Sequence, residues 1–416
     1  MKQITAIVVG AGLRGALSYA PYALENPGEL KIVGVAEPIE ARRKKLQELH
    51  NIPEENCFES WDQILAIPKF ADAALICTQD QMHYEPAMQA LELGYHLLLE
   101  KPIAPTAKEC VDIKNKANEK NLHVVVCHVL RYTTLFKELK ELISQNRIGK
   151  IMSMTHCENV YHIHHSHSFV RGNWRNSKES NPMILAKSCH DLDVIQWLAD
   201  DLCTKVSSFG SLKFFCEANA PEDAPAYCLD GCPHSDTCAY DAAKIYVKNK
   251  QWGASAFCED PANPVQVIED LRHGDYGRCV FRCDNDVVDH QVVNMEYEEG
   301  LTVAFSMCAF TQNFSRTMKL MGTYGEIRVL FGDEHIIEIY DFRTGRKDVL
   351  YPYQNKSGHG GGDFGIMSDF VKLLATGKKS SALTSIDVSV QSHLLAFAAE
   401  KSRLESQTIH MDKFEG

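Results

Sequence analysis

The stretch ITAIVVGAGLRG, residues 4–15, decides the fold. A strand-like apolar run over residues 4–9 leads directly into glycines 10, 12 and 15, in the spacing G-x-G-x-x-G. Glycine at these positions allows a tight turn, and the backbone can approach a pyrophosphate that lies at the N-terminus of the following helix. We therefore predict a dinucleotide site. Its first contacts are Gly10, Gly12, Leu13, Arg14 and Gly15.

A carboxylate follows the second apolar run at the place where a ribose-binding acid is expected. Glu37 comes directly after residues 31–36 and should accept hydrogen bonds from the adenosine ribose. Its charge should repel a 2′-phosphate, which favours NAD over NADP. Arg14, Arg42 and Arg43 could each neutralise such a phosphate, so NADP stays open, and Arg42 is counted among the candidate cofactor contacts.

The first 130 residues repeat this alternation of strand and helix. Such apolar strands are typical of a parallel sheet that is covered by helices on both faces. We predict a doubly wound α/β Rossmann domain over residues 1–130. Its strand-like runs cover residues 4–9, 31–36, 73–77, 95–99 and 123–127.

The remaining residues, 131–416, show a different pattern, and 416 residues are too many for one ordinary core. We predict an α+β domain with an open, largely antiparallel sheet, which binds substrate and mediates oligomerisation, and a Cys-rich insertion at about 213–283. Helices are expected at 135–145, 190–198 and 385–404. Strands are expected at 151–157, 287–297, 302–310, 317–321, 325–331 and 335–340.

Charge and hydropathy restrict the classes of partner. The formal net charge is −12 and there is no long basic run, so we expect no nucleic-acid partner. The apolar run at residues 4–9 is too short for a signal peptide, and no run approaches the roughly 20 residues of a membrane span. We expect a cytoplasmic enzyme of small molecules, with its 15 cysteines mostly reduced.

A lysine stands at the expected catalytic edge of the parallel sheet. Glu100, Lys101 and Pro102 follow the apolar run 95–99, and ligands bind at the carboxyl ends of such strands. Lys101 can hydrogen-bond a substrate hydroxyl and stabilise a developing alkoxide. The alternative is a surface lysine before a turn proline.

Several further motifs accompany these residues, and together they are specific. With them the sequence resembles the Gfo/Idh/MocA family of oxidoreductases over nearly the whole chain. The motifs are residues 10–15 (GAGLRG), 78–83 (TQDQMH), 100–102 (EKP), 131–132 (RY), 149–151 (GKI) and 187–193 (KSCHDLD).

The resemblance implies roles for individual residues. Lys101 and His190 would approach the reacting carbinol beside the nicotinamide, with His190 as general acid or base. Thr78, His83 and Glu100 would line the cofactor cleft, and the protein would form a homodimer or homotetramer. A structural histidine at a helix start is the other interpretation of His190.

One position departs from the family pattern. Relatives with a sugar dehydrogenase site usually carry aspartate four residues before this histidine, and here that residue is Ala186. The adjacent Lys187 supplies a cationic contact instead. We hypothesise that it suits a substrate that carries a carboxylate or a different hydroxyl pattern.

Polar and aromatic residues gather in two loops. Residues 162–175 (HIHHSHSFVRGNWR) suit a sugar, and we predict substrate contacts from His165, Arg171 and Trp174 as well as Lys187. A metal site is the alternative for these histidines. The loop 358–363 (GHGGGD) could close over the site or serve as a plain connection.

Five of the seven cysteines in the insertion fall into two groups. Cys228, Cys232 and Cys238 have the spacing C-x3-C-x5-C, and Cys279 and Cys283 follow later. Cys228, Cys232, Cys238 and Cys283 are the candidate ligands of a structural zinc, with an iron–sulfur cluster second. Free thiols are the remaining possibility.

These observations together predict hydride transfer between NAD, or NADP, and a hydroxyl carbon of a sugar, cyclitol or sugar acid. One alternative is a tightly bound NAD that is recycled in a redox-neutral glycosidic elimination or epimerisation. Another is a non-catalytic sensor of sugar or cofactor. Accumulation of NADH during turnover would indicate net hydride transfer, because an enzyme that recycles its bound NAD releases none.

Overall fold

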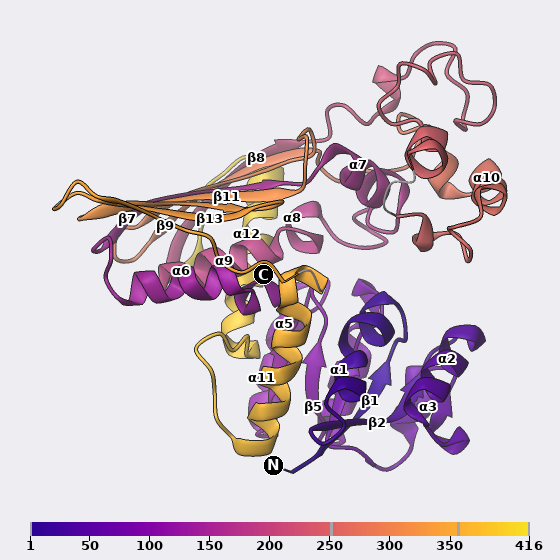
Figure 1. Ribbon diagram of the computed structural model, residues 1–416, viewed down its shortest axis with the longest axis horizontal. Helices are drawn as coiled ribbons and strands as arrows, with labels where there is room; N and C mark the ends of the chain where they lie inside the picture. Colours follow the sequence, from indigo (N-terminus) through magenta and orange to yellow (C-terminus); the bar gives the residue numbers. More distant parts are fainter. Residues whose placement is uncertain (1, 250–252, 356–357, 415–416) are drawn as a thin grey trace.

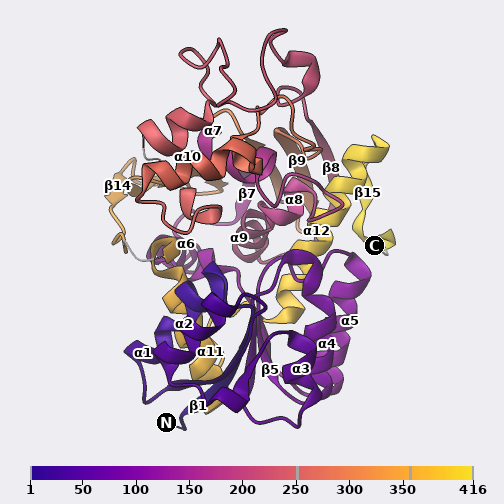
Figure 2. The ribbon, with the colours of Figure 1, turned by 90° about the vertical axis from the view of Figure 1, so that its right-hand side faces the viewer.

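The chain forms two layered halves and an outlying insertion, in a computed structural model that describes residues 2–249, 253–355 and 358–414. Figure 1 shows a parallel sheet flanked by helices in the lower half and a broad second sheet above it. The insertion, with helix α10 (Pro264–His273), extends from one end of the second sheet. Figure 2 shows the two halves joined through the region around α9 and α12.

The first sheet has six parallel strands in the order β3-β2-β1-β4-β5-β6. The inner strands are buried on both faces, as their apolar sequences require. This confirms the predicted doubly wound Rossmann fold. The strands are β1 (Ile4–Val9), β2 (Leu30–Ala36), β3 (Cys57–Phe58), β4 (Ala73–Ile76), β5 (His96–Leu99) and β6 (Val124–Val126).

Helices cover both faces of this sheet, and one of them comes from the far end of the chain. Helix α11 (Gly362–Thr376) returns to pack beside β1 and the helical turns η1 (Leu13–Tyr19) and η4 (Val129–Tyr132). It therefore lies against the glycine turn. The other helices of this half are α1 (Pro21–Glu25), α2 (Glu40–His50), α3 (Trp61–Ala66), α4 (Tyr84–Glu92) and α5 (Ala107–Glu119).

The second sheet has nine strands in the order β14-β13-β12-β11-β7-β10-β9-β8-β15. Among the described strands of this second sheet, only β7 and β10 pair in parallel, so the expected open and largely antiparallel sheet is confirmed. The strands are β7 (Ile151–Asn159), β8 (Cys203–Ser211), β9 (His290–Tyr297), β10 (Thr302–Cys308), β11 (Ser315–Gly322), β12 (Gly325–Phe331), β13 (His335–Asp341), β14 (Lys347–Leu350) and β15 (Ile409–His410).

One face of this sheet is covered and the other is open. Strand β9 alternates strictly between exposed and buried residues, and its buried side chains belong to the main core. The helices under the sheet are α6 (Thr134–Ser144), α8 (Met183–Ala186), α9 (Cys189–Ala199) and α12 (Ile386–Glu405). Because α9 lies between this sheet and the first half, its N-terminus is held at the junction.

The segment 162–171 differs from the expected extended loop. It forms helix α7 (His162–His165) and the helical turn η5 (Ser166–Arg171). In a helix, side chains three or four residues apart share a face, whereas in an extended chain they alternate between two faces. The histidines of this segment are therefore distributed around a helix. The strands β3, β8, β14 and β15 were also not expected. In the part of the chain that the structure describes, no helix has both the length and the apolar character to span a bilayer.

Candidate active site

The glycine turn at the end of β1 has the shape of a cofactor cradle. Gly10 has a φ of +92°, and a Cβ there would lie 2.6 Å from the carbonyl oxygen of Cys77. A Cβ at Gly15 would lie 2.1 Å from the carbonyl oxygen of Gly10. The Cβ position of Gly12 instead faces open space, and Leu13 is 60% exposed. The residues of this turn thus fit a pyrophosphate that approaches the backbone at Gly12.

Arg14 ties the turn to two other parts of the chain. Its Nε donates to Glu100 Oε1 at 2.6 Å, and its Nη2 donates to Asp363 Oδ1 at 2.8 Å and to the hydroxyl of Tyr19. His359 Nδ1 lies 3.0 Å from Asp363 Oδ2. The loop 358–363 is therefore fastened to the glycine turn in this structure. Arg14 is engaged with these two carboxylates.

Glu100 is buried under the turn and is not part of an open cleft wall. It accepts hydrogen bonds from Arg14, from the Tyr19 hydroxyl and from the backbone N–H of Lys101. The charges of Arg14 and Lys101 outweigh its burial and lower the pKa of this carboxyl below its usual value. Glu100 therefore stays ionised and positions Arg14 and the backbone of Lys101, while its predicted place in the cofactor cleft stays a prediction.

Glu37 stands at the predicted place but faces the turn in this structure. Its carboxylate is 4% exposed and accepts the N–H groups of Ala11, at 2.7 Å, and of Ile39, at 3.0 Å. Arg43 donates to the Glu37 carbonyl oxygen, whereas Arg42 is exposed to solvent. The carboxylate thus lies beside the glycine turn at the carboxyl end of β2.

The segment after β4 connects the two halves of the molecule. Thr78 Oγ1 donates to the carbonyl oxygen of Met82. The ring nitrogens of His83 lie 2.6 Å from the Pro102 oxygen and 3.1 Å from the Thr78 oxygen, so His83 joins this segment to the turn after Lys101. Asp80 accepts hydrogen bonds from Ser180, Asn181 and Trp174. Trp174 is thereby placed at the junction between the two halves, and its contact with substrate stays a prediction.

The two predicted catalytic residues meet at the junction between the halves. Lys101 Nζ donates to the carbonyl oxygen of Ala186 at 2.9 Å, and His190 lies in the first turn of α9, four residues further on. His190 is 8% exposed, and burial together with the charge of Lys101 lowers the pKa of its ring well below the usual value. The ring is therefore neutral near pH 7 and can accept a proton.

A second histidine that the sequence did not indicate lies directly behind His190. The ring of His128 is fully buried, and its centroid is 5.7 Å from that of His190 and 5.3 Å from that of His393. Neither ring nitrogen of His128 has a hydrogen-bond partner among the described residues. No pattern around residue 128 separates this side chain from other core positions.

Buried charges also converge on the site from the second sheet. Arg316 on β11 donates to both carboxylate oxygens of Asp191 on α9, at 2.7 and 3.0 Å, and to Glu158 on β7 at 3.1 Å. His156 lies 2.6 Å from Asp191, and Ser188 donates to Glu158 at 2.8 Å. We call these five residues the buried charge cluster. Neither Arg316 nor Glu158 could be recognised from the sequence, because their partners are far away along the chain.

Lys187 lies at the edge of this cluster. Its side chain is 14% exposed, and its Nζ is 3.8 Å from Glu158 Oε1 and 4.7 Å from the centroid of the Phe314 ring. Burial lowers the pKa of this lysine to about 8. The charge of Lys101 also lowers this pKa, so the two lysines lie within electrostatic reach of each other. The role of Lys187 as a substrate contact stays a prediction.

Two other predicted substrate contacts lie elsewhere. His165 has no exposed surface and stacks on Phe215, with centroids 5.5 Å apart. Arg171 is also fully buried and donates to the carbonyl oxygens of Arg278 and Tyr240 within the insertion. The helical course of residues 162–171 turns both side chains inward, so a substrate in the cleft does not reach them.

The predicted zinc or iron–sulfur site is not supported by the structure. Across residues 2–249, 253–355 and 358–414, no three His, Cys, Asp or Glu side chains gather as they would around a metal ion. Cys228, Cys232, Cys238 and Cys283 are half-buried free thiols in this structure. Arg171 Nη2 donates to one of them, Cys228 Sγ, at 3.6 Å.

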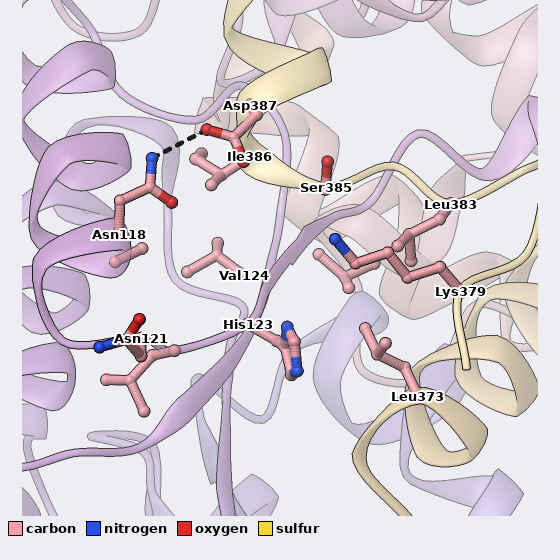
Figure 3. Close-up of a pocket in the computed structure, with 13 residues that line it drawn as sticks. Asn118, Asn121, His123, Val124, Leu373, Lys379, Leu383, Ser385, Ile386 and Asp387 are labelled. Atoms are coloured by element: carbon pink, nitrogen blue, oxygen red, sulfur yellow. Dashed lines mark hydrogen bonds between the residues drawn. The ribbon is translucent and has the colours of Figure 1, made fainter. Parts of the chain in front are cut away.

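A separate pocket of about 310 Å³ lies at the opposite end of the parallel sheet (Figure 3). It is lined by Asn121 and His123 before β6 and by Lys379 and Ser385 before α12. None of the predicted site residues lines it. Because ligands bind at the carboxyl ends of the strands in this fold, the pocket at the amino end of β6 is not the candidate active site.

Comparison with known families matches most of the chain. A model described as "Oxidoreductase family, NAD-binding Rossmann fold" matches residues 4–128. A second, described as "Oxidoreductase family, C-terminal alpha/beta domain", matches residues 140–359. The two matches together cover both halves of the molecule.

Similar curated proteins differ in how much of their length the chain covers. YteT of Bacillus subtilis is 23% identical over 353 residues, 79% of this chain and 78% of YteT. The scyllo-inositol 2-dehydrogenase (NADP+) IolW of the same species is 26% identical over 40% of this chain and 44% of IolW. The 2,7-anhydro-N-acetylneuraminate hydratase of Escherichia coli is 26% identical over 35% of this chain and 38% of the hydratase. The chain thus spans less than half of the last two relatives.

Solved structures share the complete fold at low sequence identity. An oxidoreductase from Agrobacterium radiobacter, in complex with NAD+, L-tartaric acid and magnesium, has a TM-score of 0.71 at 13% identity over 99% of both chains. Aldose-aldose oxidoreductase from Caulobacter crescentus has a TM-score of 0.69 at 13% identity, over 98% of this chain and 99% of that one.

Proposed function

Because the chain belongs to the Gfo/Idh/MocA oxidoreductase family, we propose that it transfers a hydride between NAD, or NADP, and a hydroxyl carbon of a sugar, cyclitol or sugar acid. The observation that carries this proposal is the meeting of Lys101 and His190 at the carboxyl edge of the parallel sheet. Residues 1–130 would bind the cofactor and residues 131–416 the substrate.

The cofactor would be held by the glycine turn and by Glu37. When bound, the nicotinamide accepts or supplies the hydride. Gly12 leaves room for the pyrophosphate, and Leu13, which is exposed, covers the side of that space. Glu37 can exchange its hydrogen bond with Ala11 for ribose hydroxyls, which supports NAD as the preferred cofactor.

Lys101 and His190 would move the hydroxyl proton. Lys101 uses one proton on the Ala186 oxygen, so its other two can hydrogen-bond the substrate oxygen and stabilise the alkoxide. His190 is neutral at pH 7 and takes the proton that leaves this oxygen. In the reverse reaction, the protonated ring returns it. The protein thereby contributes position and charge at the reacting carbon.

To test this proposal, the protein is incubated with NAD or NADP and with each of a panel of sugars, inositols and sugar acids. The absorbance of the reduced nicotinamide is then measured over time. Lys101→Met and His190→Asn should each lower kcat on the active substrate by about 10²- to 10⁴-fold. Lys108→Met removes the same charge from an exposed position on α5 and should leave kcat unchanged. Full kcat in both site variants would refute the assignment.

A second candidate function is a redox-neutral reaction with recycled NAD. Two relatives, from Escherichia coli and Mediterraneibacter gnavus, are named 2,7-anhydro-N-acetylneuraminate hydratase, and Ala186 departs from the sugar dehydrogenase pattern. In this case substrate would be converted without accumulation of NADH. Product analysis by mass spectrometry alongside the absorbance measurement separates the two functions.

Assembly and location belong to the same proposal. We expect a homodimer or homotetramer that forms through the open face of the second sheet. Phe209 on β8 and Val292 on β9 are cross-strand neighbours with 63% and 41% of their surface exposed, which supports an interface there. Light scattering of wild type and Phe209→Ser would test it. The 15 free thiols support a reducing compartment such as the cytoplasm.

A further inference from the structure

We propose that Lys187 binds a carboxylate of the substrate, so that the physiological substrate is a sugar acid rather than a neutral sugar or cyclitol. The inference rests on the proposed function, because it assigns the substrate class of that same site. The sequence left two kinds of substrate open for Lys187, one with a carboxylate and one with a different hydroxyl pattern. The contacts of the buried charge cluster favour the carboxylate.

Lys187 is within electrostatic reach of Lys101. It follows Ala186, whose carbonyl oxygen accepts a hydrogen bond from Lys101, and precedes His190 by three residues. A sugar whose hydroxyl binds Lys101 and His190 would therefore present another of its substituents to Lys187. The ring of Phe314, which is 37% exposed, lies under this ammonium and gives the sugar an apolar surface.

The ammonium of Lys187 lacks a hydrogen-bond acceptor among the described residues. Its nearest carboxylate oxygen, on Glu158, is 3.8 Å away, beyond hydrogen-bonding distance. Both Glu158 oxygens are already used, one by Arg316 and the other by Ser188. Lys187 thus has three unused donors in a mostly buried place, where an unpaired charge is costly.

The carboxylates around Lys187 are already engaged, which favours an anion of the substrate as its missing partner. Arg316 is engaged with both Glu158 and Asp191, and Glu100, which lies beside Lys101, is engaged with Arg14. Lys187 is therefore a cation whose nearest carboxylate stays beyond hydrogen-bonding distance. A substrate carboxylate can both accept its hydrogen bonds and pair its charge, whereas a neutral hydroxyl supplies only the hydrogen bond.

The proposal is tested with pairs of sugars that differ only in a carboxylate. D-galacturonate with D-galactose and D-glucuronate with D-glucose are offered to the full-length protein with NAD, and kcat/KM is measured for each. Wild type should prefer the acid in at least one pair by more than tenfold. Lys187→Met should lower this preference by about 10- to 100-fold, and Lys187→Arg should retain most of it.

Two controls separate the possible failures. Lys178→Met removes the same charge from an exposed position in the neighbouring segment and should leave the preference unchanged. Binding of each sugar to the NAD-loaded protein by calorimetry does not depend on turnover. If the acids bind only when Lys187 is present but are not turned over, the carboxylate site is supported and the dehydrogenase function is refuted. A preference for neutral sugars, an acid preference that survives in Lys187→Met, or no binding of any acid would overturn the inference.

Discussion

At the residue scale, Glu37 connects the stability of the glycine turn to the choice of cofactor. Its carboxylate accepts two backbone N–H groups. If it also binds the adenosine ribose, as we propose, its charge should disfavour a 2′-phosphate. Glu37→Gln keeps the shape and removes the charge. We expect the ratio of the Kd for NADP to the Kd for NAD to fall by about tenfold, as measured by fluorescence titration. An unchanged ratio would show that this carboxylate does not select the cofactor.

Lys187 makes a second prediction at this scale, for the pH dependence of KM. Burial, together with the charges of Arg316 and Lys101, lowers its pKa to about 8 against the opposing charges of Glu158 and Asp191. The ammonium is charged below this pH and loses its charge as the pH rises through it. The KM for a sugar acid should therefore rise above pH 8 in wild type. Lys187→Arg stays charged and should show a flat KM up to pH 9.5; identical profiles would contradict the assignment.

At the element scale, one buried ion pair fixes helix α9 relative to the first half. Arg131 in η4 donates from Nε and Nη2 to the two carboxylate oxygens of Asp193, both at 2.6 Å. Arg131→Met leaves a buried carboxylate without its partner. We expect the free energy of unfolding to fall by about 3–5 kcal/mol, measured by urea denaturation.

The double variant Arg131→Met/Asp193→Leu is the control for this pair. It removes both charges, so most of the lost stability should return. Because α9 also carries His190, the single variant should lower kcat as well. If the double variant is as unstable as the single one, the loss comes from packing and not from the unpaired carboxylate.

At the scale of the whole molecule, buried neutral histidines should set the acid limit of stability. His165 and His393 are fully buried, and burial lowers their pKa values to about 4 and about 3. In the unfolded chain both histidines become protonated as the pH falls through about 6.5, whereas in the folded chain they stay neutral to a lower pH. Stability is therefore fully present above that pH and is lost as the pH falls toward 4, by about 1.4 kcal/mol per pH unit for each histidine.

This loss is measured as the slope of the unfolding free energy between pH 6 and pH 4.5. His165→Phe preserves the ring stacking on Phe169 and Phe215 and removes one titrating group. Its slope should be smaller by about 1.4 kcal/mol per pH unit. An equal slope in the variant would mean that protonation of His165 does not contribute to acid unfolding.

The parallel half of the molecule followed closely from its sequence. Strand β1 has the predicted bounds, and the other four predicted strands agree within one or two residues. Their signal is local, because a strand buried on both faces must be apolar throughout. Strands such as β8 (Cys203–Ser211) were missed because they mix polar and apolar residues, and their pairing with β9 depends on distant parts of the chain.

The sequence by itself determined the family, the glycine turn and the positions of Lys101 and His190, because each depends on short motifs. Only the tertiary structure decided which charges surround them. Arg316 meets Asp191 across 125 residues, and Arg14 meets Asp363 across 349. It also turned His165 and Arg171 inward, since residues 162–171 are helical. Such contacts arise from the packing of a sheet against helices, and no spacing along the chain encodes them.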